Sequence, residues 1–145
     1  MRLFQNILVP FDLSTQSTRA FKVALDIAKN YNSKVTLLTC LEGDAWQHKF
    51  YDSRADAELL KKQKKVTEKY LEKLESLADK NKVTVKSHIV KSKSVVNDIV
   101  TFAKSRKYDL IVIGSHGRTG FDKVLLGSVA NGVSQKTSCP ILIVK

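Results

Sequence analysis

The chain has 145 residues, of which 43% are hydrophobic, and this suits one globular domain with a substantial core. No apolar run approaches the roughly 20 residues that cross a membrane. The start of the chain also lacks the apolar stretch of a secretory signal, so we expect a cytoplasmic protein with no membrane partner. The two cysteines, Cys40 and Cys139, are then expected to be reduced and partly buried.

The net charge of +11 raises the question of an anionic partner. The lysines are spread along the chain, and in its middle third they alternate with acidic residues. That pattern is typical of a solvated helix surface rather than of a nucleic-acid-binding stripe. Charge alone therefore does not predict a nucleic-acid partner.

The first third of the chain predicts a strand, a helix and a second strand. Residues 7–11 are a short apolar run, and Asp12 lies at its carboxyl end. Ser14, Thr15 or Ser17 can cap a helix there, as can Asp12 itself, and apolar side chains then recur at helical spacing. Residues 35–41 predict the second strand, so a parallel pair with a right-handed crossover is expected.

The middle of the chain predicts one long helix. The preceding polar loop holds aromatic residues, among them Trp46, that could flank a ligand or cover the core edge. Residues 52–81 then repeat apolar positions at helical spacing, and we expect one such stripe to pack on a sheet. The predicted stripe consists of Leu59, Val66, Tyr70, Leu74 and Leu77.

The last third continues the alternation of strands and helices. Residues 83–90 predict a third strand, whose polar–apolar alternation indicates an edge position. A turn at residues 91–94 and a helix capped by Ser94 follow, and then strands at residues 110–113 and 140–144 flank a last helix. The whole pattern predicts a single doubly wound α/β domain over residues 1–145, with five parallel strands and four helices.

A glycine-rich stretch links the fourth predicted strand to the last helix. Two residues separate Gly114 from Gly117, and nine more precede Gly127 and Ser128. Glycines let backbone N–H groups approach an anion, and a helix start adds unpaired N–H donors with a partial positive charge. The stretch is neither a Walker A loop nor a dinucleotide fingerprint, but this arrangement of strand, loop and helix is typical of a phosphate site.

Three candidate pieces fall at the carboxyl ends of predicted strands. They are residues 10–12, Cys40 and the stretch that begins at Gly114. Ligands of open α/β sheets bind beyond the carboxyl ends of the strands, where the strand order reverses. The three pieces therefore indicate one shared site.

Four segments of the sequence resemble the universal stress protein family in its ATP-binding subclass. They read Gly-Ser-His-Gly-Arg-Thr-Gly, Leu-Leu-Gly-Ser-Val, the opening Ile-Leu-Val-Pro-Phe-Asp and the ending Cys-Pro-Ile-Leu-Ile-Val-Lys. The resemblance covers nearly the whole chain. It implies a Rossmann-like strand order of 3-2-1-4-5, an ATP pocket between strands 1 and 4, a stress-response regulatory role, and a homodimer formed through the C-terminal strand.

The resemblance also implies a set of contacts to ATP. The Asp12 carboxylate would meet the adenine or ribose edge, and it can accept two ribose hydroxyls. His116 is expected to supply a hydrogen bond or fix the loop rather than to catalyse. Arg118 could add a charge-assisted contact or simply be solvated. The remaining implied contacts come from Pro10 and the Cys40 backbone at the base, Ile113 and Gly114 at the ribose and α-phosphate, and Gly117, Gly127, Ser128 and Val129 at the phosphates.

The sequence favours binding over committed catalysis. Phosphoryl transfer needs a metal ion and a positioned nucleophile, and no paired carboxylates stand beside the loop to hold one strongly. Mg²⁺ or Mn²⁺ would then be held mainly by the phosphates, and any ATPase activity would be slow. The alternative is an α/β scaffold with an empty pocket, which binds nucleic acid or an acidic protein through its basic surface.

Overall fold

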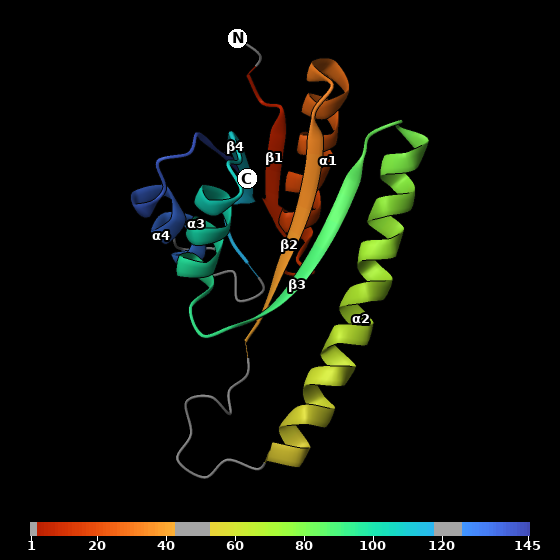
Figure 1. Cartoon of the computed structure of the whole chain (residues 1–145), viewed down its shortest axis with the longest axis vertical. Helices are drawn as coiled ribbons and strands as arrows, with labels where there is room; N and C mark the ends of the chain where they lie inside the picture. Colours follow the sequence, from red (N-terminus) through yellow and green to blue (C-terminus); the bar gives the residue numbers. More distant parts are fainter. Residues whose placement is uncertain (1–2, 43–52, 118–125) are drawn as a thin grey trace.

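A single parallel sheet forms the centre of the computed structural model, which describes residues 3–42, 53–117 and 126–145 (Figure 1). Its strand order is β3-β2-β1-β4-β5, as the resemblance implied. All neighbouring strands in this sheet run parallel. The strands are β1 (Asn6–Pro10), β2 (Lys34–Glu42), β3 (Val85–Ser92), β4 (Leu110–Gly114) and β5 (Ile141–Val144).

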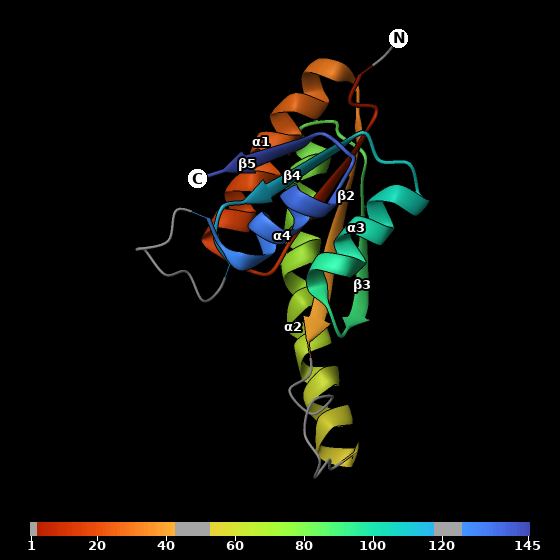
Figure 2. The ribbon, with the colours of Figure 1, turned by 90° about the vertical axis from the view of Figure 1, so that its left-hand side faces the viewer.

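Helices cover both faces of this sheet. Helices α1 (Thr15–Tyr31) and α2 (Ser53–Lys80) lie on one face, and α3 (Val95–Ser105) and α4 (Ser128–Lys136) lie on the other (Figure 2). The central strands pair with neighbours on both sides, so their backbone groups are satisfied within the sheet. In the described part of the chain, no helix is both long and apolar enough to cross a membrane.

The two faces of the sheet build two hydrophobic clusters. The cluster under α1 and α2 is centred on Phe21, which is fully buried with its neighbours on β1 and β2. The cluster under α3 and α4 is centred on Leu8 and Ile111, again fully buried. Strands buried on both faces are expected for a parallel sheet, and this is why their sequences are continuous apolar runs.

Two helix starts follow the predicted capping. The Ser14 hydroxyl accepts a hydrogen bond from the Ser17 backbone N–H at 3.1 Å and begins α1. The Ser94 hydroxyl accepts one from the Asn97 backbone N–H at 3.3 Å and begins α3. Each cap satisfies an N–H group that has no partner inside its helix.

One carboxylate joins the beginnings of the two central strands. Asp109 accepts hydrogen bonds from the backbone N–H groups of Gln5, at 2.8 Å, and Asn6, at 3.0 Å. Its own N–H donates to the Asn6 carbonyl oxygen at 3.0 Å. Asp109 therefore fixes the register between β1 and β4 at their amino ends.

The third strand lies two residues later than predicted. Val83 is buried just before it, and its N–H donates to the Ala78 carbonyl oxygen at 3.0 Å, closing the end of α2. Lys91 and Ser92, predicted as part of a turn, continue the strand and pair with the end of β2. The edge position predicted for this strand is confirmed.

The face by which α2 packs on the sheet differs from the prediction. Leu59, Val66 and Tyr70 are 54%, 49% and 46% exposed, so the prediction was wrong for these three residues. Two of the buried residues of α2, Thr67 and Ala78, have short side chains, so the helix can approach the strands closely there. The buried row consists of Thr67, Leu71, Leu74 and Ala78, with Leu77 partly buried beside it.

Candidate functional site

The site lies where β1 and β4 end side by side. β1 leads into α1 on one face of the sheet, whereas β4 leads into α4 on the other face, so the two connections diverge (Figures 1 and 2). In open α/β sheets this divergence creates the crevice in which ligands bind. The buried Pro10 ends β1 and Gly114 ends β4, so both are at this point.

Asp12 follows β1 and is held in place by the turn that precedes α1. Its Oδ1 accepts a hydrogen bond from the Ser14 backbone N–H at 3.0 Å, and its own N–H donates to the Ser17 hydroxyl at 3.4 Å. The cap of α1 is Ser14, so the alternative role of Asp12 as a helix cap is wrong. The half-buried Asp12 lies two residues beyond the carboxyl end of β1.

Gly117 brings the loop after β4 against this carboxylate. A Cβ atom at Gly117 would lie 2.6 Å from Asp12 Oδ2, closer than such atoms can approach. The loop can therefore pass over Asp12 in this position only because residue 117 has no side chain. Two of the predicted residues, far apart in the sequence, are thus in contact.

Gly127 closes the other end of the same loop. Its N–H donates to the Ser115 carbonyl oxygen at 2.7 Å, and a Cβ there would lie 3.2 Å from the His116 Cα. The Ser115 N–H in turn donates to the Val144 carbonyl oxygen of β5 at 2.8 Å. The loop is therefore anchored to the sheet where it leaves β4 and where it enters α4.

His116 is oriented by its neighbour at the start of the loop. Its Nδ1 lies 3.1 Å from the Ser115 hydroxyl, within hydrogen-bonding distance. The ring is half-buried, between the exposed Gly117 and the buried Ser115. This geometry agrees with a positioning role for His116.

The amino end of α4 is well suited to an anion. Its cap is Gly127, which provides no side-chain hydrogen bond, and the first turn contains no acidic residue. Gly127 has no side chain that could accept from the first N–H groups of α4. These groups lie at the positive end of the helix dipole. Ser128, which is exposed, and Val129 form the first turn of this helix.

Gly114 is needed for packing between β4 and α1. A Cβ at this position would lie 2.9 Å from the Gln16 carbonyl carbon and 3.0 Å from its Cβ. The beginning of α1 therefore rests directly on the end of β4. The neighbouring Ile113 is buried in the cluster under α3 and α4, so only its backbone remains available to a ligand.

The backbone of Cys40 borders the crevice on the side of β2. The pairing of β1 with β2 ends at Pro10 and Leu38, and the Phe11 N–H donates to the Leu38 carbonyl oxygen at 2.9 Å. Backbone groups two residues apart on a strand point the same way, so those of Cys40 point past the end of β1.

The Cys40 thiol is not a nucleophile at neutral pH. Burial, helped by the charges of Asp98 and Glu42, raises its pKa to about 12. Burial and Asp109 also raise the pKa of the Cys139 thiol. Both cysteines are free and half-buried, as predicted.

Two further points of the predicted chemistry concern Arg118 and the metal ion. Arg118 lies outside the described residues. Within residues 3–42, 53–117 and 126–145, no group of three or more His, Cys, Asp or Glu side chains could hold a metal ion.

Two residues of the site were missed in the sequence. Ser115, which is only 4% exposed, anchors Gly127 and orients His116, yet in the sequence it is simply one more polar residue of a loop. Gln16 supports Gly114 through its backbone, a role that no residue type would reveal. Only the distance between segments far apart in the chain identifies them.

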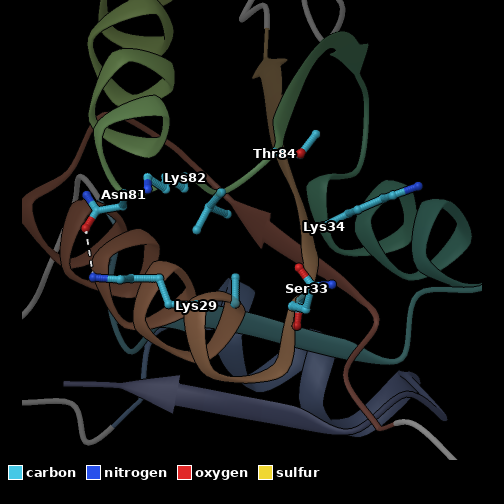
Figure 3. A pocket seen from close by; sticks show the side chains of 9 residues that line it. Lys29, Ser33, Lys34, Asn81, Lys82 and Thr84 are labelled. Carbon is cyan, nitrogen blue, oxygen red and sulfur yellow. Dashed lines mark hydrogen bonds between the residues drawn. The ribbon is translucent and has the colours of Figure 1, made fainter.

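A cavity of about 300 Å³ lies at the opposite end of the sheet, between the last turns of α1 and α2 (Figure 3). There Lys29 Nζ donates to Asn81 Oδ1 at 3.3 Å, and Asn81 Nδ2 donates to the Leu77 carbonyl oxygen at 2.8 Å. The Ser33 hydroxyl donates to the Phe4 carbonyl oxygen. The Lys29–Asn81 hydrogen bond connects the end of α1 to the segment after α2, and we interpret the cavity as part of the packing between these elements.

The sequence model described as the universal stress protein family matches residues 3–145. The chain therefore belongs to that family. This agrees with the α/β fold and with the glycine loop at the crevice.

Two curated relatives match nearly the whole chain. The universal stress protein MJ0531 of Methanocaldococcus jannaschii is 32% identical over 99% of this chain and 83% of its own length. The universal stress protein YxiE of Bacillus subtilis is 29% identical over 99% of this chain and all of its own.

Solved structures match the fold closely. That of the protein MJ0577 superposes with a TM-score of 0.87 at 27% identity, covering 99% of this chain and 96% of its own. UspA of Lactobacillus plantarum gives 0.88 at 24% identity, covering 99% of both chains. Among more distant matches, one universal stress protein was solved in complex with cAMP, and one from Archaeoglobus fulgidus in complex with dAMP.

Proposed function

We propose that this protein is an ATP-binding regulatory module of the stress response. One observation carries the proposal: the loop after β4 lies against Asp12 at Gly117 and ends in an α4 start that has no side-chain cap. In the proposed complex the Asp12 carboxylate would bind sugar hydroxyls and the N–H donors would bind phosphates. ATP presents both kinds of group.

The proposed arrangement gives each part of ATP a partner. The adenine would lie against Pro10 and the Cys40 backbone, with the ribose hydroxyls donating to Asp12. The phosphates would lie along the loop toward Gly127 and the first turn of α4. Each of these protein groups borders the crevice, and the α4 start complements phosphate charge.

Related proteins support the choice of an adenine nucleotide. Two of the matching universal stress proteins were solved with cAMP and with dAMP. Both molecules share the adenine base with ATP but carry a single phosphate.

Any turnover of ATP is expected to be slow. Mg²⁺ or Mn²⁺ would be held mainly by the phosphates, because the described residues offer no group of acidic or histidine ligands. We propose a rate well below the 1–10³ s⁻¹ that is typical of enzymes. The bound nucleotide would then act as a signal rather than as a substrate.

We also propose that the protein is a homodimer formed through β5. This strand lies at the edge of the sheet, and Leu142 in it is 39% exposed. An apolar strand edge promotes pairing with another chain, and pairing with a second copy by twofold symmetry covers it. Sedimentation of the wild-type chain beside a Leu142→Lys variant tests this, and a wild-type monomer would contradict it.

Calorimetric titration of MgATP into nucleotide-free protein tests the nucleotide proposal. We expect micromolar binding to the wild type and its loss in Gly117→Val, whose side chain would meet Asp12. A Lys29→Met variant, changed in the cavity at the opposite end, should bind as the wild type does. Absence of binding to folded wild-type protein would overturn the proposal, as would equal binding to Gly117→Val.

A further inference from the structure

Helix α2 has an exposed apolar row that the fold does not use. The amino half of α2 extends beyond the carboxyl ends of β2 and β3, at the end of the molecule where the site lies (Figures 1 and 2). Leu59, Val66 and Tyr70 are 54%, 49% and 46% exposed along it. Exposed apolar side chains that recur along one face of a helix, here with Gln63 between the first two, indicate a surface that contacts something else.

The spacing of this row is that of helix-to-helix packing. Leu59, Gln63, Val66, Tyr70 and Lys73 follow one another at intervals of four, three, four and three residues. Alternating intervals of three and four define the a and d positions of a heptad, which form a narrow seam against a second helix. Lys73 Nζ also lies 5.5 Å from the centre of the Tyr70 ring, which extends the seam. We call these five residues the α2 seam.

The two sides of the α2 seam differ in charge and access. On one side, the buried Thr67 and Leu74 face the sheet, so no partner helix can approach there. On the other side, Lys62 and Lys69 occupy the flanking heptad positions and are exposed. Flanking charges of a heptad seam select partners by charge, so an occupant must present acidic residues to these lysines.

Further lysines, at Lys65 and Lys73, add to this charge. Lys62, Lys65, Lys69 and Lys73 follow at intervals of three and four residues, and all are exposed. Like charges at such intervals repel and destabilise a helix slightly. Glu58 and Glu72, four and three residues from Lys62 and Lys69, offset part of this repulsion, but the lysines outnumber them on this side of the helix. The excess positive charge makes this side complementary to an acidic partner.

A second copy of this chain does not fit the α2 seam. In an antiparallel pair, twofold symmetry would place the lysine side of one helix beside the lysine side of the other. In a parallel pair, each lysine side would need the side of the partner helix that its own sheet covers. A membrane is also a poor occupant, because Gln63 and Lys73 interrupt a seam that is already narrow.

We propose that the α2 seam is a docking site for an amphipathic helix of another protein, with acidic residues along the flank that faces Lys62 and Lys69. The helix would lie antiparallel or parallel to α2 on its lysine side. This proposal does not depend on nucleotide binding.

Two synthetic helical peptides test the proposal against the full chain. Both carry leucine at every a and d position; one has glutamate on its flanks and the other lysine. Fluorescence anisotropy should show binding of the glutamate peptide at least about tenfold tighter than that of the lysine peptide. A Val66→Glu variant, changed at an exposed position, should lose about tenfold or more in affinity for the glutamate peptide.

Charge reversal separates the seam from general attraction. The double variant Lys62→Glu and Lys69→Glu should reverse the preference between the peptides. The control Lys61→Glu and Lys64→Glu has the same net charge but changes residues away from the seam, and it should preserve the preference. Similar loss in both variants, or equal binding of both peptides by the wild type, would overturn the proposal. So would self-association through Val66, or binding to vesicles of anionic lipid that Val66→Glu abolishes while no peptide binds.

Discussion

One oxygen of the Asp12 carboxylate accepts a hydrogen bond from the turn before α1. In our proposal, the charge of the same carboxylate strengthens its contact with the ligand. Asp12→Asn keeps an acceptor for the Ser14 N–H but removes the charge. We expect a slightly lower melting temperature and a loss of about tenfold in ATP affinity, because hydrogen bonds to a charged group are the stronger ones. Calorimetry and thermal melts measure the two effects. Wild-type affinity in this variant would show that the carboxylate does not contact the nucleotide.

The two cysteines are expected to react slowly in the folded protein. Burial raises the pKa of Cys40 from 9.0 to about 12, so the reactive thiolate is scarce at pH 8. Iodoacetamide should modify Cys40 and Cys139 much faster in urea than in buffer, and Ellman's reagent gives the same comparison. Equal rates in the two conditions would contradict the burial of these thiols.

The raised thiol pKa also has a consequence for stability. A group whose pKa is raised by folding favours the folded state below its unfolded pKa and loses that contribution as pH rises. For Cys40 the loss should fall between pH 9 and about 12. Cys40→Ser should therefore show less alkaline destabilisation than the wild type in urea melts across that range.

At residue level, the sequence allowed predictions where a residue type is strongly associated with one structural or chemical role. The close approaches at Gly117 and Gly127 agree with residues that lack a side chain, whereas the binding of hydroxyl groups by Asp12 stays a prediction. The contact of Gly114 with Gln16 could not be predicted, because it joins backbone atoms of distant segments. For Arg118, which is outside the described residues, the contact with phosphate stays a prediction.

At the level of elements, α3 and α4 pack through a glycine. A Cβ at Gly132 would lie 2.8 Å and 3.0 Å from the two methyl carbons of Val96. Alanine is the better helix former by about 1 kcal/mol, but this contact should reverse the sign and destabilise Gly132→Ala by about 1 kcal/mol. In a Val96→Ala background the same change should stabilise. Urea melts of the double-mutant cycle test this, and additive effects would contradict it.

The packing of α2 gives a test of which face meets the sheet. Leu71 is 3% exposed, whereas Val66 is 49% exposed. Leu71→Ala should cost about 2–5 kcal/mol of unfolding free energy, because it leaves a cavity, and Val66→Ala about 0.5 kcal/mol or less. Chemical denaturation of both variants measures the difference. Equal losses would restore the face predicted from the sequence.

The choice between the two faces of α2 was beyond the sequence. The stripe predicted from the sequence mixed two rows of the helix, because Leu59, Val66 and Tyr70 are exposed whereas Leu74 is buried and Leu77 partly buried. The sheet takes the row with Thr67 and Ala78 instead. A hydrophobic pattern shows that a face is apolar but not what covers it.

At the level of the whole molecule, nucleotide binding should appear as stability. A ligand that binds only the folded state stabilises it by about 2.7 kcal/mol at a concentration of 100 times its dissociation constant. We therefore expect MgATP to raise the melting temperature of the wild type but not of Gly117→Val, with GTP as a control for base preference. A shift of equal size in the variant would place the nucleotide elsewhere.

The strand order illustrates how far whole-fold prediction reached. The alternation of strands and helices predicted a parallel sheet of five strands, and this is confirmed. Periodicity does not encode which strands are neighbours, and the order came from the family resemblance. The pairing of β1 with β4 depends on contacts such as those of Asp109 with Gln5 and Asn6, which connect opposite ends of the chain.

The pairing of β1 with β4 determines how long β1 lacks one of its two neighbours while the chain is synthesised. β1 lies at the centre of the sheet, yet one of its two partners, β4, is synthesised only after β2, β3 and three helices. At about 5–20 residues per second, the apolar edge of β1 waits roughly 5–20 s for its partner. During that interval the nascent domain exposes an open strand edge. Chaperones are therefore needed most by chains stalled before residue 110, and truncation at that point should yield an aggregating fragment.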